Sequence, residues 1–166
     1  MIHHEGVPHL FIRSAILTSF ISCLALAAAA PALAAKAPVL AFSTALSPDH
    51  AAVKALLEQQ SGVTIDDKWL EIAPIDLDGD GTPELFVMPI NTDYFCGDAG
   101  CRPSIFKSDG AGWKQIDIGL NDFTNSEPGM WSVDAKPQNG HLVLVLTESQ
   151  FTARFVWDGT AYSSPD

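Results

Sequence analysis

The acidic segment of residues 76–84 reads Asp76-Leu77-Asp78-Gly79-Asp80-Gly81-Thr82-Pro83-Glu84, with carboxylates at positions 1, 3, 5 and 9 and glycine at positions 4 and 6. Seven carboxylates and no Lys, Arg or His lie between Trp69 and Cys101. Two unit charges about 6 Å apart repel by roughly 3 kcal/mol at an effective dielectric constant of about 20, so a loop that gathers several carboxylates is unfavourable without a counter-charge. The segment therefore predicts a loop that binds a cation.

Calcium suits this spacing because it accepts about 6 to 8 oxygen ligands at about 2.4 Å in flexible geometry. Alternate positions of a curled loop turn their side chains inward, and position 7 can offer a backbone carbonyl. The predicted ligands are Asp76, Asp78, Asp80, Thr82 and Glu84. Position 12 is Val87, where an EF-hand needs a bidentate Glu, and Glu84 leads into the apolar run Leu-Phe-Val, so we expect the loop to enter a β-strand.

Two other interpretations of this loop remain open. Asp side chains in Asp-Gly turns accept hydrogen bonds from nearby backbone amides, so the segment is also consistent with a solvated hairpin turn. A Lys or Arg from a distant part of the chain would also neutralise the carboxylates. Magnesium fits less well because it demands stricter octahedral geometry.

The string D-L-D-G-D-G-T-P-E-L-F-V resembles the calcium loops of FG-GAP and VCBS repeats, which join two strands in integrin-type propeller blades. The resemblance implies the same ligands, with Asp76, Asp78, Asp80 and Glu84 acting through side chains and Thr82 through its backbone. Glu84 stands where the motif more often has Asp. Together with C-G-x-x-G-C and a closing W-D-G-x-x-Y, the loop is similar to small exported bacterial proteins of unknown function.

The first 34 residues carry the pattern of a signal peptide. Arg13 precedes an apolar run over residues 15–30, and Ala32-x-Ala34 supplies the small residues that a signal peptidase requires, which places the cut after Ala34. An uncleaved anchor or a lipoprotein is the alternative, although Phe20-Ile21-Ser22-Cys23 lacks the usual aliphatic residue of a lipid-attachment box. We therefore expect a periplasmic or secreted protein with one domain over residues 35–166, too short for a whole propeller.

The charge of the predicted mature chain limits its partners. Removing the leader leaves 8 basic and 19 acidic residues, so the net charge stays at −11. Binding to nucleic acids or to anionic lipids depends on Lys and Arg, so neither partner is expected. We expect a monomer that binds a protein or glycan ligand, and the charge favours a cationic one. One alternative is an inhibitor of a cationic cell-wall hydrolase such as lysozyme.

Two cysteines, Cys96 and Cys101, follow the leader and should form a disulfide in an exported chain. Closing a loop of six residues contributes roughly 2 kcal/mol in the chain-entropy model. The C-x4-C spacing differs from the C-x-x-C of thioredoxin-like redox pairs. Tyr94, Phe95 and Arg102 flank this loop and form a candidate binding surface, although packing of the two aromatic rings against the bridge is the plainer interpretation.

The sequence predicts an α+β domain, in which one N-terminal helix packs on a twisted antiparallel sheet of about 6–8 strands arranged as blade-like hairpins. Ser47-Pro48-Asp49 provides an N-cap and a first turn, and Gly62 ends the helix. His50 is expected on its solvated face. Short β-rich runs separated by turn residues follow, at residues 69–75, 85–90, 103–108, 113–118, 131–135, 141–147, 151–157 and 160–163.

Two segments share the pattern F-x2-D-G-x2-aromatic. One runs from Phe106 to Trp113 and the other from Phe155 to Tyr162, and each follows an apolar strand. The pattern indicates either two copies of one β unit or two unrelated hairpins with flanking aromatic residues.

Enzyme activity is not expected. The mature chain has no G-x-S-x-G motif, and His50 and His141 are its only candidate histidine bases. A carboxylate-dependent hydrolase stays open as an alternative because Asp and Glu are plentiful.

Overall fold

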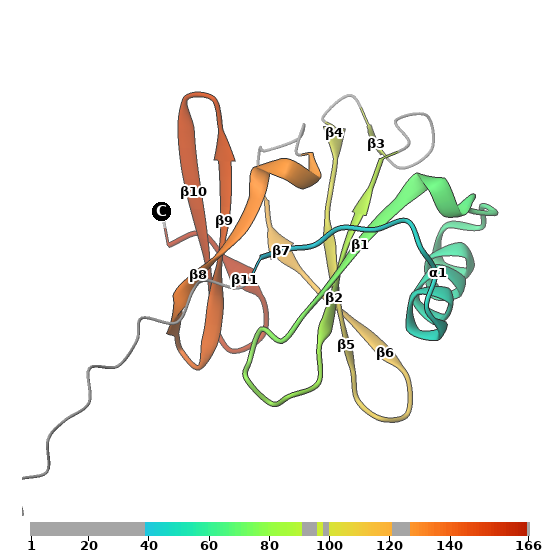
Figure 1. The fold of residues 1–166 in the computed structure, drawn as a ribbon, viewed down its shortest axis with the longest axis horizontal. Helices are drawn as coiled ribbons and strands as arrows, with labels where there is room; N and C mark the ends of the chain where they lie inside the picture. Colours follow the sequence, from blue (N-terminus) through green and yellow to red (C-terminus); the bar gives the residue numbers. More distant parts are fainter. Residues whose placement is uncertain (1–38, 91–95, 98–99, 121–126, 166) are drawn as a thin grey trace, which may run out of the picture. The chain divides into compact units, whose positions relative to one another are not determined.

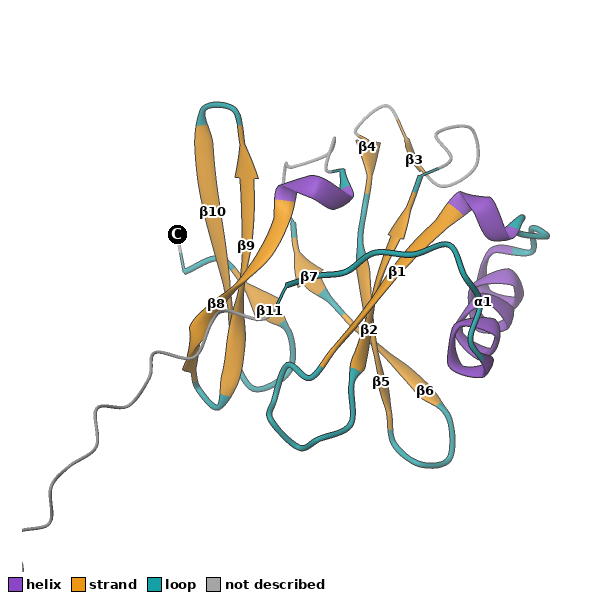
Figure 2. Cartoon of the chain, viewed as in Figure 1, coloured by secondary structure: helices purple, strands orange, loops and turns teal. Residues whose placement is uncertain are grey.

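The computed structural model describes residues 39–90, 96–97, 100–120 and 127–165, all within the compact unit Ala34–Asp166 (Figure 1). One α-helix and two main β-sheets make up this part of the chain (Figure 2). None of the helices in the described ranges has the length and apolar character needed to cross a bilayer.

Helix α1 spans Pro48–Ser61 and is bounded by the residues that the sequence indicated. The Ser47 hydroxyl accepts a hydrogen bond from the His50 backbone N–H, and Gly62 adopts the left-handed conformation with φ of 71°. A short 3-10 helix, Asp67–Trp69, then leads into the first strand. His50 was expected on the solvated face, and this prediction was wrong because its ring is buried and its Nδ1 lies 2.7 Å from the Ala45 carbonyl oxygen.

The first sheet has four antiparallel strands in the order β1-β2-β5-β6. Their bounds are Leu70–Ile75, Glu84–Pro89, Ser104–Ser108 and Trp113–Ile116. A two-stranded hairpin of β3 (Cys96–Gly97) and β4 (Gly100–Cys101) lies between β2 and β5 in the chain. Cys96 and Cys101 face each other in this hairpin and are joined by a disulfide, as predicted.

The second sheet has five strands in the order β7-β11-β10-β9-β8. The strands are β7 (Ile118–Gly119), β8 (Trp131–Gln138), β9 (His141–Glu148), β10 (Phe151–Trp157) and β11 (Tyr162–Ser163). A 3-10 helix, Pro128–Met130, precedes β8. Strand β11 pairs with β7 in parallel, whereas the other pairs are antiparallel.

The α+β class is confirmed, but the single sheet of about 6–8 strands was wrong. The eight predicted runs overlap the main strands, yet these strands divide between two sheets. The two-residue strands β3, β4 and β7 were not foreseen as separate strands. Helix α1 packs on the four-stranded sheet. The periodicity of one strand does not show which strand lies beside it. The number of sheets therefore could not be predicted from periodicity.

Side-chain alternation on β2 explains the layers. Leu85 and Val87 pack with Val53 of α1 in one apolar cluster, whereas Phe86 and Met88 face the second sheet in another. Phe86 contacts Trp131 of β8 with ring centroids 5.1 Å apart. Because successive residues of a strand point to opposite faces, one short strand holds the helix on one side and the second sheet on the other.

The two F-x2-D-G-x2-aromatic segments form matching hairpins, β5–β6 and β10–β11. In the first, Asp109 Oδ1 accepts the backbone N–H groups of residues 111 and 112. In the second, Asp158 Oδ1 accepts those of residues 160 and 161. Each hairpin belongs to a four-stranded antiparallel meander, β1-β2-β5-β6 or β8-β9-β10-β11, so the two segments share strand order as well as turn chemistry.

Phe86→Ala tests the packing between the sheets. The side chain is fully buried between two aromatic rings, so its loss should lower the free energy of unfolding by about 3–5 kcal/mol. Urea unfolding followed by Trp fluorescence measures this change. Val39→Ala is the control, because Val39 is 70 % exposed and should change stability by less than about 0.5 kcal/mol. Equal effects of the two substitutions would contradict the two-sheet core.

Candidate cation-binding loop

The acidic loop connects β1 to β2 and is held against the second sheet. Ile75 pairs with Glu84, so residues 76–83 form the connection between the two strands. Leu77 is buried in the core between the sheets, and its carbonyl oxygen accepts the Leu142 backbone N–H of β9 at 2.7 Å. The loop is therefore anchored by an apolar side chain and a backbone hydrogen bond, while its Asp side chains lie at or near the surface.

Asp76 folds the loop back on itself. Its Oδ1 accepts the Gly79 N–H at 2.8 Å and its Oδ2 accepts the Gly81 N–H at 3.0 Å. Gly79 and Gly81 have φ angles of 75° and 86°, which residues with a Cβ rarely adopt. The glycines at positions 4 and 6 thus let successive amides converge on one carboxylate.

Asp78 and Asp80 make the same kind of local contact. Asp78 Oδ1 accepts the Asp80 N–H at 3.1 Å, and Asp80 Oδ1 accepts the Thr82 N–H at 2.7 Å. The Thr82 N–H lowers the pKa of Asp80, and Lys107 lowers it further. The Asp side chains therefore accept nearby backbone amides, as the interpretation of an Asp-rich turn expects. Both oxygens of Asp76 are engaged in this way, whereas the second oxygens of Asp78 and Asp80 contact Lys107.

Glu84 is the buried member of the loop. It lies on the same face of β2 as Phe86 and Met88, toward the second sheet, and its side chain is 3 % exposed. Its Oε2 accepts the Leu77 N–H at 2.8 Å. Burial raises the pKa of Glu84, and the hydrogen bonds from Leu77 and Lys107 oppose that rise. A carboxylate in this position requires compensating positive charge.

Lys107 of β5 supplies part of this charge. Its Nζ lies 3.1 Å from Asp80 Oδ2 and 3.1 Å from Glu84 Oε1, and it also pairs with Asp78 Oδ2. Leu85 pairs with Phe106, so the next step of the register places Lys107 opposite Glu84. The hydrogen bond to Asp78 is the main cause that raises the pKa of Lys107 above its usual value.

The loop therefore does not depend on a metal alone for its counter-charge. Calcium was the preferred counter-charge and a distant Lys or Arg the alternative; the contacts of Lys107 show that a basic side chain supplies at least part of it. One ammonium, however, balances one of the four carboxylates of the loop and leaves a formal excess of three negative charges.

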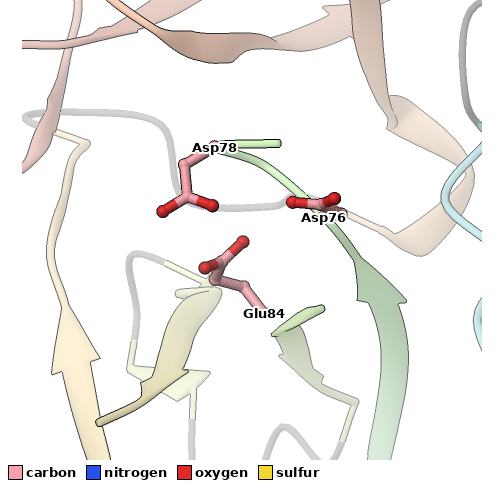
Figure 3. Close-up of side chains that lie close together, drawn as sticks. All are labelled: Asp76, Asp78 and Glu84. Atoms are coloured by element: carbon pink, nitrogen blue, oxygen red, sulfur yellow. The ribbon is translucent and has the colours of Figure 1, made fainter. Parts of the chain in front are cut away.

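Asp76, Asp78 and Glu84 form an acidic triad that could hold a metal ion (Figure 3). One oxygen from each residue lies within 4.8 Å of the others. Two oxygens bound to one calcium ion at about 2.4 Å are at most about 4.8 Å apart, so the spacing is compatible with a shared ion. Asp80 lies outside this triad, and the predicted role of the Thr82 carbonyl stays a prediction.

Tyr162 of β11 was missed as part of this region. It is fully buried, and its hydroxyl has no hydrogen-bond partner among the described residues. Burial raises its pKa, and the charges of Glu84 and Asp78 raise it further, so the phenol lies within the electrostatic reach of the loop. The W-D-G-x-x-Y motif marked this residue, but only the packing of the two sheets brings it to an acidic loop that is far away in sequence.

The other predicted binding residues give a mixed result. Tyr94 and Phe95 lie outside the described residues. Arg102 is exposed, and its guanidinium donates a hydrogen bond to the Leu120 carbonyl. His141 stacks on Trp157 with ring centroids 4.6 Å apart.

A cavity of about 330 Å³ adjoins the loop through Lys107. Residues of the β5–β6 hairpin line one part of it, and Trp157 and Thr160 line another. Its volume is near the lower end of the range of about 300–1,000 Å³ found for ligand pockets.

Comparisons of the chain with protein-family models, curated proteins and solved structures found no match. The resemblance to FG-GAP and VCBS calcium loops accordingly rests on the short sequence motifs alone.

Lys107→Met tests the internal counter-charge. Without calcium, this change leaves Asp78, Asp80 and Glu84 without their ammonium partner and should lower the free energy of unfolding by about 1–3 kcal/mol. Because salt screens repulsion among partly exposed carboxylates, the loss should shrink in 1 M NaCl. Urea unfolding in EDTA at low and high salt gives both quantities.

Lys114→Met provides the matched control. Lys114 of β6 lies opposite Lys107 of β5 in the strand register. No ion pair of Lys114 is found in the described part of the chain. If both substitutions had the same effect on stability and salt dependence, Lys107 would not have its assigned role.

Proposed function

We propose that this protein is an exported, calcium-binding, disulfide-stapled β-rich module in which one ion organises the loop between β1 and β2. The observation that carries the proposal is the convergence of Asp76, Asp78 and Glu84 oxygens within 4.8 Å, in a loop whose carboxylates exceed its ammonium by three. A dication would reduce that excess to one negative charge. The proposed partner is a protein or glycan, and the net charge of −11 favours a cationic surface on it.

The donor set favours calcium over other metals. Carboxylate oxygens are hard ligands, whereas zinc sites use mainly Cys and His. Both cysteines of the proposed mature chain are joined in the disulfide. Magnesium would require an octahedral arrangement at about 2.1 Å, which a loop that already bends its Asp side chains toward backbone amides is less suited to provide.

In the calcium-bound protein, some carboxylates of the loop would contact Lys107 and the others would bind the ion. Asp80 lies outside the triad and accepts the Lys107 ammonium at 3.1 Å, so it can retain this contact while Asp78 and Glu84 turn to the ion. Calcium binding then requires the exchange of two ammonium contacts for stronger contacts to a dication. We therefore expect modest affinity, in the range of about 10⁻⁴–10⁻³ M that extracellular calcium modules use.

A binding role agrees better with this site than catalysis does. Glu84 has the most deeply buried carboxylate of the triad, and it is engaged by Leu77 and Lys107. A substrate has little access to it as a general acid or nucleophile. The cavity beside Lys107, with Trp157 in its wall, supports a small ligand or a partner side chain as an occupant.

Thermal melting in EDTA and in 10 mM calcium tests the proposal. If Kd is about 0.1 mM, the stabilisation is about 2.7 kcal/mol. For a domain of this size it should raise Tm by about 10 °C. Asp78→Asn should remove most of this shift, because it weakens one ligand of the triad and leaves a side chain of nearly the same shape. Calorimetric titration of each folded protein with calcium measures binding directly.

Asp158→Asn is the control for the loss of an Asp from an Asp-Gly turn. Asp158 accepts backbone N–H groups in the β10–β11 hairpin and is not part of the triad. The variant should keep the full calcium shift. The proposal fails if the wild-type protein shows neither a shift nor binding heat with calcium.

A further inference from the structure

The hydroxyl oxygen of Tyr162 is a buried polar atom without a hydrogen-bond partner among the described residues. The ring belongs to the core between the sheets, 5.6 Å from the Trp157 ring and 6.3 Å from the His141 ring between centroids. Its hydroxyl is shielded from solvent and makes no hydrogen bond with the described residues. Buried hydroxyls almost always have a partner, so this atom indicates an interaction that the described residues do not supply.

The surroundings of the hydroxyl indicate what that interaction is. The Leu77 carbonyl of the acidic loop accepts the N–H of Leu142, which follows His141 in β9, and the His141 ring lies 6.3 Å from the Tyr162 ring between centroids. Burial raises the pKa of Tyr162, and the charges of Glu84 and Asp78 also raise it. Glu84 and Asp78 belong to the acidic triad, and Leu77 of the same loop shares the core cluster with Tyr162. The phenol of the five-stranded sheet is therefore a neighbour of the candidate ion site on the four-stranded sheet.

We propose that the Tyr162 hydroxyl belongs to the calcium site and that its oxygen accepts a hydrogen bond from a water molecule bound to the ion. This inference rests on the proposed function. Calcium takes about 6 to 8 oxygens, so three carboxylates leave coordination positions for water. Water on a dication directs its hydrogens away from the ion and is a strong donor, and a phenol oxygen is a suitable acceptor.

The consequence is a link between the two sheets. The triad residues come from β1–β2, whereas Tyr162 comes from β11, so an ion hydrated between them would connect the two meanders at the end of their shared core. Calcium would then stabilise the packing of the sheets in addition to the loop. Trp131 also has an unpartnered buried N–H among the described residues, but an indole can only donate and cannot accept from ion-bound water.

Tyr162→Phe tests the inference, because it removes one oxygen and keeps the ring. In EDTA the variant should melt at or above the wild-type Tm, since an unsatisfied buried hydroxyl is lost. Its calcium Kd, measured by calorimetry, should rise about tenfold, as is typical when a group outside the first coordination shell is removed. A variant that melts no lower in EDTA and binds calcium as tightly as the wild type would overturn the inference.

Trp131→Phe is the control for a general disturbance of the core. It should lower Tm, because the larger ring is lost between Phe86 and Phe155, and it should leave the calcium Kd unchanged. A similar rise in Kd for this variant would show that affinity follows core stability and would contradict a specific role of the hydroxyl. Wild-type protein that does not bind calcium would instead overturn the proposed function.

A second measurement does not depend on removing the hydroxyl. The chain has two tyrosines, Tyr94 and Tyr162, so Tyr94→Phe leaves Tyr162 as its only tyrosine. In ¹³C-tyrosine-labelled protein, the Cζ resonance of Tyr162 should shift on calcium addition with the Kd found by calorimetry. A resonance that stays in place while calorimetry reports binding would exclude the proposed contact.

Discussion

Electrostatic compensation at Glu84 joins the acidic loop to the rest of the fold. Its carboxylate is buried at the start of β2, where it accepts the Leu77 N–H and contacts the Lys107 ammonium. Burial alone would favour the protonated acid, as the raised pKa of Glu84 reflects. The two bonds that hold the ionised form connect β2 to its own loop and to β5, so the site and the sheet are stabilised by the same contacts.

The same region lies between two meanders of equal topology. Each meander contains an Asp-Gly hairpin after a strand with a fully buried Phe, Phe106 in one sheet and Phe155 in the other. The connection between the first two strands differs between the meanders. The long acidic loop joins β1 to β2, whereas a tight Asn139-Gly140 turn with positive φ at both residues joins β8 to β9. One meander therefore carries the candidate ion site, and the other contributes Tyr162 to the core that the loop residue Leu77 shares.

Local features were predictable from sequence because neighbouring residues determine them. Ser47 and Gly62 bound the helix, Asn139-Gly140 forms a hairpin, and Cys96 pairs with Cys101. Three of the four predicted side-chain ligands converge as expected, since the spacing of a short loop restricts where its side chains can lie. The predicted number of sheets was wrong because the alternation of apolar and polar residues shows which face of a strand is buried but not which strands pair with it.

The sequence by itself determined the acidic loop, its glycine bends and the strands on either side, since these depend on residues fewer than ten positions apart. Only the tertiary structure decided which cation from the chain reaches the loop and which side chains surround it. Lys107 arrives through the pairing of β2 with β5, and Tyr162 through the packing of one sheet on the other. Both contacts join residues that are distant in sequence. Strand pairing and core packing bring these residues together, and both depend on the folded chain as a whole.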